Sequence, residues 1–478
     1  MLRALLFLAL PLCVTAAPNV LFLLADDFRP ELGCYGSSAL TPNLDKLASR
    51  GVRFENAYCQ QAVCNPSRSS FLTGKRPDSL RIWNNSVHFR ERNPDVMTIP
   101  LWFKQHGYET RDCGKVFHNW HTKEHGDPRS WSAPEFLHYA NHGHDTPQVQ
   151  GELPPNLAVL SPRNYTNVPL DECRDVPDEA YYDGRVAAEA IKTLAEVKDK
   201  PFFLAVGMWK PHAPFNAPKK YWDLYQRDQL PKLNPARPTG APDIAFHEST
   251  EILGPVKEQK PLSAEKIAEM RHGYFANISY MDAQIGKVLD ALEQSGQAAN
   301  TIIIFFADHG YHIGEHTLWG KTSNFEYDAH VPLIVSAPGV AGNKATKSMA
   351  ELVDVFPTLV DLCALPKPEG LDGASLVPVL RDPTVSVHEA SFTQHPRPAY
   401  FDRQPSGVPS TMGCSVRTGA VRYTEWRDWK TGEVVARELY DSINDPTELR
   451  NAIDATELAA EQTKAAALLG KQFPVVKH

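Results

Sequence analysis

The segment Cys64–Arg68 carries the residue types of a reactive turn. Asn65 and Pro66 are residues that begin helices, so the cysteine would lie at the positive end of a helix dipole. Arg68, one helical turn later, would return to the same face of that helix. A reactive side chain next to a fixed cation and free backbone N–H groups suits chemistry on an oxyanion. The alternative for a lone cysteine near a proline is a buried thiol without chemistry.

Two apolar runs end in residues that could hold a metal ion. They are residues 18–25, followed by Asp26 and Asp27, and residues 301–307, followed by Asp308 and His309. Strands that are apolar on both faces occupy the centre of covered, mostly parallel sheets, and such sheets place their sites at the carboxyl ends of the strands. Neighbouring carboxylates repel each other unless a cation lies between them. The pattern therefore favours a hard divalent cation, Ca²⁺ first, over the alternative of a solvated turn.

Basic side chains follow the reactive turn and the remaining strand ends. They are Arg68, Lys115, His118, His212 and Lys321. Each taken singly is more typical of a solvated or satisfied polar residue, but acids and bases that share these positions around a cysteine indicate an anion-binding site. Spacing along the chain does not show that they converge, so the fold has to bring them together.

Alternating strands and helices predict a doubly wound α/β domain with helices on both faces of a mostly parallel sheet. Strands are expected over 52–58, 108–113, 201–207 and 331–337, and helices over 41–50, 98–106, 178–198, 263–295 and 352–363. We expect this catalytic domain to span residues 18–375. The segments 119–176 and 214–261 are rich in Pro, and we expect them to be irregular insertions that shape a cleft.

The chain changes character after the Pro- and Gly-rich stretch 365–373. Residues 414–418 and 421–426 alternate as short antiparallel strands would, and residues 457–469 favour a terminal helix. This pattern predicts a smaller C-terminal α+β domain over 376–478.

Composition and the N-terminus point to an exported soluble protein. The 478 residues are 42% hydrophobic and 22% charged with a net charge of −8, and no Lys/Arg run marks a nucleic-acid surface. Residues 1–17 have the charged start, short apolar stretch and small-residue end of a secretory signal, and no other segment is long enough to span a membrane. We expect a periplasmic or extracellular location, or a lysosomal one in an animal host. A lipid-modified Cys13 is the alternative.

The eight cysteines do not form the pattern of a disulfide scaffold. Cys13 would leave with the signal, and Cys64 is assigned to chemistry. The other six allow fifteen pairings, and none has the C-x-x-C spacing of a metal site. We expect mostly free, buried thiols and at most one or two bridges among Cys34, Cys59, Cys113, Cys173, Cys363 and Cys414.

The cysteine segment, with Leu72-Thr73-Gly74 behind it, closely resembles the motif of the type I sulfatases of the alkaline phosphatase superfamily. In these enzymes the cysteine is oxidised to formylglycine, an aldehyde that hydrates to a gem-diol. The resemblance covers nearly the whole chain and favours the branch that contains the iduronate-2-sulfatases. The other matching segments are Asp26–Pro30, Leu32–Gly36, Gln60–Cys64, Gly114–His118, Lys210–His212, Asp308–Gly310, Gly314–His316, His395–Pro398 and Met412-Gly413.

The resemblance implies a role for each residue singled out above. One Ca²⁺ ion would be held by Asp26, Asp27, Asp308, His309 and the hydrated aldehyde derived from Cys64, and it would activate the attacking hydroxyl. Arg68 would steady the diol, Lys115 and Lys321 would neutralise sulfate oxygens, His212 would protonate the departing sugar oxygen, and His118 would deprotonate the second hydroxyl so that sulfate leaves. A formylglycine-generating or sulfatase-maturing enzyme that acts on Cys64 is the implied protein partner.

The substrate implied by the branch is a terminal 2-O-sulfated uronate of an oligosaccharide or polysaccharide. Arg397 could pair with its carboxylate, although a surface role for Arg397 is equally consistent with the sequence. Tyr311 and Cys414 depart from the Trp and Tyr expected in this branch, and the two insertions align poorly with it. Sulfated algal galactans, fucans or ulvans therefore stay open as substrates. A phosphonate monoester or phosphodiester hydrolase, or a secreted glycan-binding protein without activity, are the alternative functions.

Overall fold

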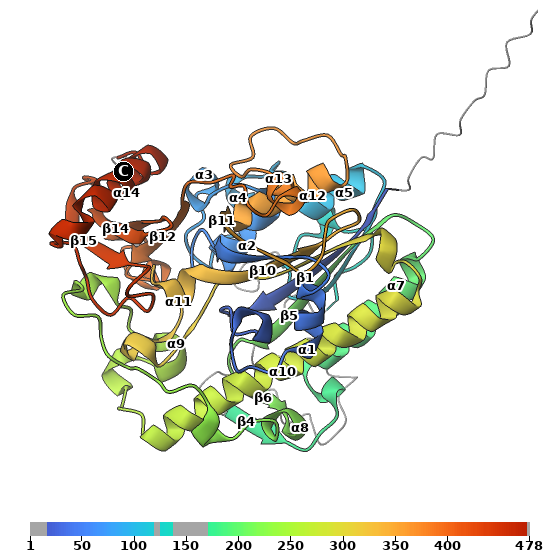
Figure 1. Ribbon diagram of the computed structural model, residues 1–478, viewed down its shortest axis with the longest axis horizontal. Coiled ribbons are helices and arrows are strands. Elements are labelled where there is room, and N and C mark those ends of the chain that lie inside the picture. The colour runs from blue at the N-terminus through green and yellow to red at the C-terminus, as the bar shows by residue number, and fades with distance from the viewer. Residues whose placement is uncertain (1–16, 119–124, 137–170, 476–478) are drawn as a thin grey trace, which may run out of the picture.

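A seven-stranded sheet forms the centre of the protein in the computed structural model, which describes residues 17–118, 125–136 and 171–475 (Figure 1). Every strand of this sheet is parallel to the others except β10, which runs antiparallel to both of its neighbours. The strands lie in the order β11 (Lys344–Glu351), β2 (Val52–Tyr58), β10 (His330–Ser336), β7 (Thr301–Ala307), β1 (Asn19–Asp26), β5 (Phe202–Pro211) and β3 (Glu109–Gly114).

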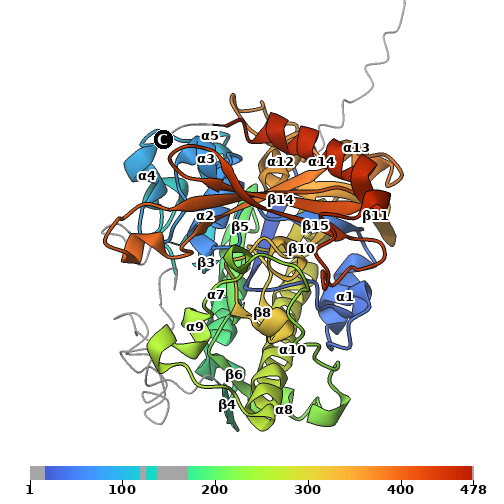
Figure 2. The ribbon, with the colours of Figure 1, turned by 90° about the vertical axis from the view of Figure 1, so that its left-hand side faces the viewer.

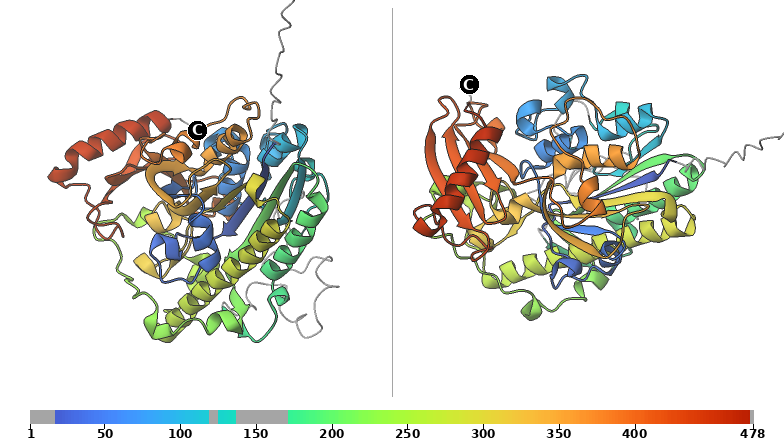
Figure 3. Two further views of the ribbon diagram at one scale, coloured as in Figure 1. Left: turned by 45° about the vertical axis from the view of Figure 1, so that its right-hand side comes forward. Right: turned by 45° about the horizontal axis from the view of Figure 1, so that its top comes forward.

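Strands β7, β1 and β5 are neighbours inside the sheet, and every one of their residues is buried. Their continuous apolar runs match this position because helices cover both faces of the sheet (Figures 1 and 3). One face carries α1 (Pro42–Ala48), α7 (Tyr182–Val197) and α10 (Ala264–Gln294), and the other carries α2 (Cys64–Thr73), α5 (Ile99–Gln105) and α12 (Val355–Leu362). The predicted doubly wound α/β domain is confirmed.

A second, four-stranded antiparallel sheet follows in the C-terminal part, as predicted (Figure 2). Its strands are β12 (Ser391–Arg397), β13 (Thr411–Arg417), β14 (Val421–Asp428) and β15 (Val434–Asp441), and α14 (Ala459–Gln472) packs on one face. Strand β12 also contacts the large domain just before the cysteine turn, where the backbone N–H of Gln394 donates to the backbone carbonyl oxygen of Gln60 at 2.9 Å. The small sheet therefore borders the segment that leads to Cys64.

The structure differs from the sequence expectations in two places. Strands β11, β12 and β15 were not expected as such, and β11 (Lys344–Glu351) is a partly exposed edge strand with too few apolar residues to signal burial. The two insertions are not wholly irregular, because β4 (Asp171–Arg174) in one pairs in parallel with β6 (Phe215–Pro218) in the other. Residues 119–124 and 137–170 lie outside the described residues, and the domain boundary near 375 stays a prediction.

Short elements complete the described chain. They are α3 (Pro77–Leu80), α4 (Phe89–Arg92), α8 (Lys219–Trp222), α9 (Thr250–Leu253), α11 (Glu326–Ala329), α13 (Val377–Arg381), β8 (His312–Ile313) and β9 (Trp319–Gly320). None of the helices in the described ranges has the length and apolar character needed to cross a bilayer. The expected signal, residues 1–17, lies outside the described ranges except for its last residue. The seven described cysteines are free thiols.

The parallel strands bring their carboxyl ends to one edge of the sheet. Ala25 of β1 pairs with Ala307 of β7, and Asp26 pairs with Pro211 of β5, so the residues that follow these strands are neighbours. Gly114 ends β3 at a φ of +89°, a conformation that favours glycine, and it turns the chain toward Lys115. The fold thus supplies the convergence that spacing alone could not show.

Candidate active site

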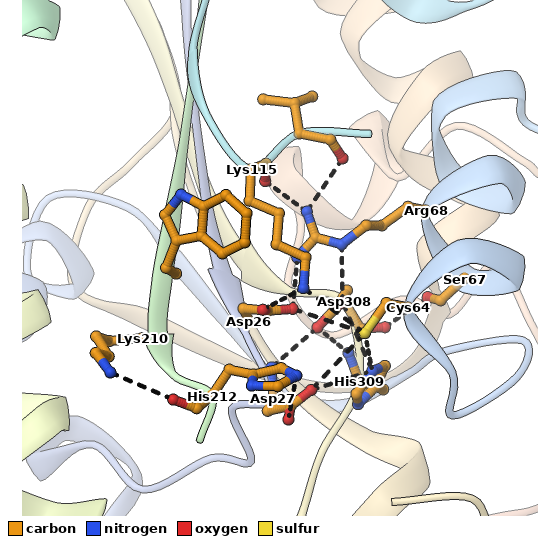
Figure 4. A network of polar contacts seen from close by, with 12 residues as sticks. Asp26, Asp27, Cys64, Ser67, Arg68, Lys115, Lys210, His212, Asp308 and His309 are labelled. Atoms are coloured by element: carbon orange, nitrogen blue, oxygen red, sulfur yellow. Dashed lines mark hydrogen bonds and ion pairs between the residues drawn. The ribbon is translucent and has the colours of Figure 1, made fainter. Parts of the chain in front are cut away.

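Cys64 is the first residue of α2 and is 1% exposed. A five-residue turn connects the end of β2 at Tyr58 to Cys64, and all ten residues of α2 are buried. The Asn65 side-chain amide donates to the carbonyl oxygens of Asn84 (2.9 Å) and Val87 (2.8 Å), which fixes the turn. The predicted position of the cysteine at a helix start is therefore confirmed, with its sulfur facing the carboxyl edge of the sheet (Figure 4).

Arg68 joins three strand ends from within the same helix. Its guanidinium donates to Asp26 Oδ1 and to Asp308 Oδ2, both at 2.9 Å, and to the carbonyl oxygens of Lys115 and Val116 (Figure 4). The side chain is fully buried, so these charge-assisted hydrogen bonds form without competition from water. The geometry makes Arg68 a residue that fixes the positions of the two carboxylates.

His309 points one ring nitrogen at the carboxylates. Its Nδ1 lies 2.9 Å from the Gly310 carbonyl oxygen, an arrangement that places a proton on Nδ1. Its Nε2 faces Cys64 Sγ at 3.4 Å, Asp27 Oδ1 at 3.4 Å and Asp308 Oδ2 at 3.6 Å. In the tautomer without a proton on Nε2, this nitrogen and the carboxylate oxygens are all acceptors, a set that a bound cation would satisfy.

The donor set fits a divalent metal ion. Two overlapping groups have their ligand atoms within 4.8 Å of one another, Asp27 with Cys64 and His309, and Asp26 with Cys64 and Asp308. Histidines that bind a metal ion usually donate their other ring N–H to a carbonyl or carboxylate oxygen. The Gly310 carbonyl oxygen lies next to Nδ1 of His309 in this way. The four predicted metal ligands therefore come together with the cysteine.

Two lysines supply counter-charges to these acids. Lys115 Nζ pairs with Asp26 and lies 3.8 Å from Cys64 Sγ, while Lys321 Nζ lies 2.9 Å from both carboxylate oxygens of Asp27. Burial alone would raise the pKa of Asp26, but Lys115 and Arg68 hold it well below its usual range. For Asp27 burial prevails over Lys321, and its pKa lies well above the usual range.

The unmodified thiol of Cys64 is a poor nucleophile. Burial raises its pKa to about 12, although Lys115 and Lys321 act in the opposite direction. At neutral pH the sulfur stays protonated, and the thiolate is the reactive form of cysteine. The raised pKa therefore gives the unmodified thiol no advantage as a nucleophile, and it is consistent with a modified cysteine at this position.

His212 lies within the same network, at the end of β5. Its Nδ1 is 2.6 Å from the Ala213 carbonyl oxygen, and its Nε2 is 3.1 Å from Lys321 Nζ and 3.5 Å from Asp27 Oδ2. His118 is 4% exposed and lies in the loop that follows β3, three residues after Lys115. The catalytic role assigned to each histidine stays a prediction.

Arg397 binds backbone rather than open solvent. Its guanidinium donates to the carbonyl oxygens of Ile244 (2.8 Å), Ala245 (2.8 Å) and Thr322 (2.9 Å). It thereby ties the 214–261 excursion and the Lys321 segment to the small sheet. The same side chain lines a pocket of about 300 Å³, so its predicted contact with substrate stays a prediction.

Sequence reasoning missed Glu251 and Tyr400. Glu251 Oε1 lies 2.9 Å from Lys321 Nζ and 3.2 Å from His212 Nε2, and the Tyr400 hydroxyl donates to Glu251 Oε2 at 3.2 Å. Tyr400 also lines the pocket that Arg397 borders. Both residues come from segments without periodicity or motif, and we find no sequence signal that would have identified them.

Comparisons with known proteins agree with this geometry. The profile of the family described as Sulfatase matches residues 18–364, and that of the N-sulphoglucosamine sulphohydrolase C-terminal region matches residues 314–472. Iduronate 2-sulfatase of Mus musculus is 35% identical over 517 residues, which cover 93% of this chain and 92% of that protein.

Two solved structures share the fold. A phosphonate monoester hydrolase from Silicibacter pomeroyi superimposes with a TM-score of 0.76 at 22% identity, with 96% of each chain covered. A 2-O GAG sulfatase superimposes with a TM-score of 0.65 at 21% identity, with 95% of this chain and 92% of that chain covered.

Proposed function

We propose that this chain, which belongs to the sulfatase family and is a sulfuric ester hydrolase, removes sulfate from a terminal 2-O-sulfated uronate of an oligosaccharide or polysaccharide. The observation that carries the proposal is the position of Cys64 at the start of a buried helix, with Asp27, Asp308 and His309 beside its sulfur and two lysines around it. The similarity to iduronate 2-sulfatase supports the choice of substrate.

The charge of the site supports a monoanionic substrate. Four carboxylates of the network (Asp26, Asp27, Asp308 and Glu251) face three permanent cations (Arg68, Lys115 and Lys321). When all four carboxylates are ionised, as they would be around a bound metal ion, one negative charge is left over, which a divalent cation converts into one positive charge. A sulfate monoester carries a single negative charge, whereas a phosphate monoester carries about −1.5 to −2 at neutral pH and matches less well.

We propose that the cofactors are one Ca²⁺ ion and formylglycine formed from Cys64. Asp26, Asp27, Asp308 and His309 would hold the ion, which when bound supplies positive charge to the sulfuryl oxygens. The hydrated aldehyde would supply one nucleophilic hydroxyl and a second hydroxyl whose deprotonation would permit the release of sulfate.

The protein's own side chains move the protons and orient the sulfate. As an imidazolium whose Nδ1–H donates to the Ala213 carbonyl oxygen, His212 would give its Nε2 proton to the departing sugar oxygen. His118 would accept the proton of the second hydroxyl. Lys115 and Lys321 would bind sulfate oxygens after a metal ion has taken over part of the charge of Asp26 and Asp27.

A cationic pocket next to Lys321 supports a substrate with a carboxylate. The pocket of about 300 Å³ is lined by two arginines, Arg397 and Arg403, against one acid, Glu248, and by Tyr400, which connects it to the network through Glu251. The exposed Arg403 stacks on the Tyr400 ring at 4.4 Å and has no ion-pair partner among the residues that the structure describes. Arg403 is thus better placed than the backbone-bound Arg397 to pair with a uronate carboxylate.

Maturation and export belong to the same proposal. A sulfatase-maturing enzyme would oxidise Cys64 before the segment becomes buried, since the folded chain leaves the thiol 1% exposed. The signal-like residues 1–17 would direct the protein to the periplasm or the cell exterior.

A panel of defined oligosaccharides tests the function. Protein coexpressed with a formylglycine-generating enzyme, with Cys64→Ala as the blank, should release sulfate from terminal 2-sulfated uronates. Release only from sulfated algal fragments would overturn the proposed substrate but would keep the proposed reaction, hydrolysis of a sulfate ester. Turnover of phosphonate monoesters with no sulfate release from any sugar would overturn both.

A further inference from the structure

The Glu251 carboxylate connects the two groups that are proposed to act on the leaving group and the sulfate. Its Oε1 lies 2.9 Å from Lys321 Nζ and 3.2 Å from His212 Nε2, so one oxygen is shared by both side chains. The second oxygen accepts the Tyr400 hydroxyl at 3.2 Å. Both oxygens of this acid are therefore committed to residues at the edge of the site.

The segment that carries Glu251 is fixed against the segment that carries Lys321. Glu251 lies in α9 (Thr250–Leu253), and the Ser249 hydroxyl just before it accepts the Trp319 amide at 2.9 Å. Trp319 begins β9, which ends one residue before Lys321. Ile252, the residue after Glu251 in α9, is buried in the core. The distance between Glu251 and Lys321 is thus set by backbone contacts as well as by their own ion pair.

A carboxylate at this place needs a reason, because the neighbouring groups are meant to attract an anionic sulfate. A negative charge 2.9 Å from Lys321 weakens the attraction of that lysine for sulfate. A neutral acceptor would satisfy the same donors without this cost. The charge is therefore better explained by what it does for His212 than by what it does for sulfate.

His212 needs an acceptor on the proton that it is to deliver. A histidine that protonates a leaving group is the imidazolium, in which Nδ1–H donates to the Ala213 carbonyl oxygen and Nε2–H lies within hydrogen-bond distance of Glu251 Oε1. Asp27 Oδ2 is farther away at 3.5 Å, and a bound metal ion would engage it. Glu251 is then the acid that keeps Nε2–H in place and aimed at the site.

We propose that Glu251 is a positioning residue that orients His212 for protonation of the leaving oxygen. The proposal rests on the proposed role of His212 as the leaving-group acid. Glu251 makes no bond to the substrate in this account and acts through His212, with Lys321 and Tyr400 fixing the carboxylate from either side.

The test is a set of sulfate esters whose leaving groups differ in how much they need a proton. Unactivated phenyl and alkyl sulfates need an acid, whereas 4-nitrophenyl sulfate leaves readily as its anion. We expect Glu251→Ala to lower kcat for the unactivated esters by about tenfold or more, and for 4-nitrophenyl sulfate by less than about threefold. Glu258→Gln, in the same excursion and exposed, is the matched control and should not change either rate.

Two further variants separate orientation from a general structural effect. Glu251→Gln keeps an oxygen that can accept the Nε2 proton, so it should recover part of the rate on the unactivated esters. The double variant Glu251→Ala/His212→Ala should be no slower than His212→Ala, because a residue that acts only through His212 has no effect once His212 is gone. A kcat loss with unchanged leaving-group preference, or full additivity in the double variant, would overturn the proposal.

The ester series does not depend on the sugar. If the wild-type enzyme releases no sulfate from uronates but hydrolyses the aryl and alkyl sulfates, the proposed substrate fails and the role of Glu251 is still tested. If Glu251→Ala does not fold, judged by its thermal unfolding, the comparison is made with Glu251→Gln. That variant should then show an intermediate leaving-group preference, and a wild-type preference would contradict the proposal.

Discussion

The Nε2 atom of His309 lies 3.4 Å from the Sγ atom of Cys64, with its ring oriented by the Gly310 carbonyl on the opposite side. This nitrogen therefore points into the same space that Asp27 and Asp308 face. This relationship links the reactive turn to the metal ligands, because the atom that replaces Sγ after oxidation would occupy that space too.

Removal of divalent metal should abolish turnover and leave the fold in place. The carboxylates keep Lys115, Lys321 and Arg68 as partners when no metal is bound, so the metal-free protein has no unpaired acid to unfold it. We expect dialysis against a chelator to remove activity while circular dichroism is unchanged, and Ca²⁺ to restore the rate. Full activity after complete chelation, verified by elemental analysis, would contradict the proposed metal site.

His212→Ala should hurt sugar sulfates more than activated aryl sulfates. The imidazole is within the network, 3.1 Å from Lys321, and its proposed task is to protonate an oxygen that leaves poorly as an anion. We expect a loss of roughly 10²-fold or more in kcat on sugars, and a clearly smaller loss on 4-nitrophenyl sulfate. Equal losses on the two substrates would count against the role as general acid.

Arg403→Ala should raise KM for uronate substrates and leave aryl sulfates unaffected. Its exposed guanidinium lines the pocket next to Tyr400, whereas Arg397 is bound to three backbone carbonyls. We expect a KM increase of about tenfold, the size of one lost charge-assisted hydrogen bond. Arg397→Ala should instead lower the melting temperature. A lower melting temperature in Arg403→Ala with unchanged KM would reverse these assignments.

Glu326→Gln should reduce the loss of stability that falling pH causes at the contact between the two domains. Burial raises the pKa of Glu326, but Arg417 and Arg422 prevail and hold it below its usual range. A carboxyl with a lowered folded-state pKa contributes stability above its unfolded pKa of about 4.3, and this contribution is lost as pH falls. We expect urea unfolding to show a loss of stability as pH falls below about 5 that is smaller in Glu326→Gln, and an identical pH slope would refute it.

Much of the fold and of the site could be predicted because the relevant signals are local. The apolar runs of β1, β5 and β7 specify buried parallel strands, and parallel strands place the residues that follow them at one edge. Asp26, Asp308, Lys115 and His212 are all residues of this kind. Their convergence follows from the sheet order and not from any property of the side chains themselves.

The residues that were missed depend on long-range contacts. Glu251 belongs to a Pro-rich excursion, and its position is set by Ser249 and Trp319, which are 70 residues apart in sequence. Arg397 looked like a free cation, but its surroundings are carbonyl oxygens of two other segments. Strand β10 runs antiparallel to both of its neighbours, yet its buried apolar run resembles those of the parallel strands β1 and β7, and such a run does not indicate the direction of a strand.

The most direct measurement combines mass analysis of the Cys64 peptide with the rate of sulfate release from the same preparations. Preparations with different degrees of conversion of the thiol to the aldehyde should show a kcat proportional to the converted fraction, and Cys64→Ala should be folded and inactive. An enzyme that releases sulfate at full rate with Cys64 entirely in the thiol form would contradict the account.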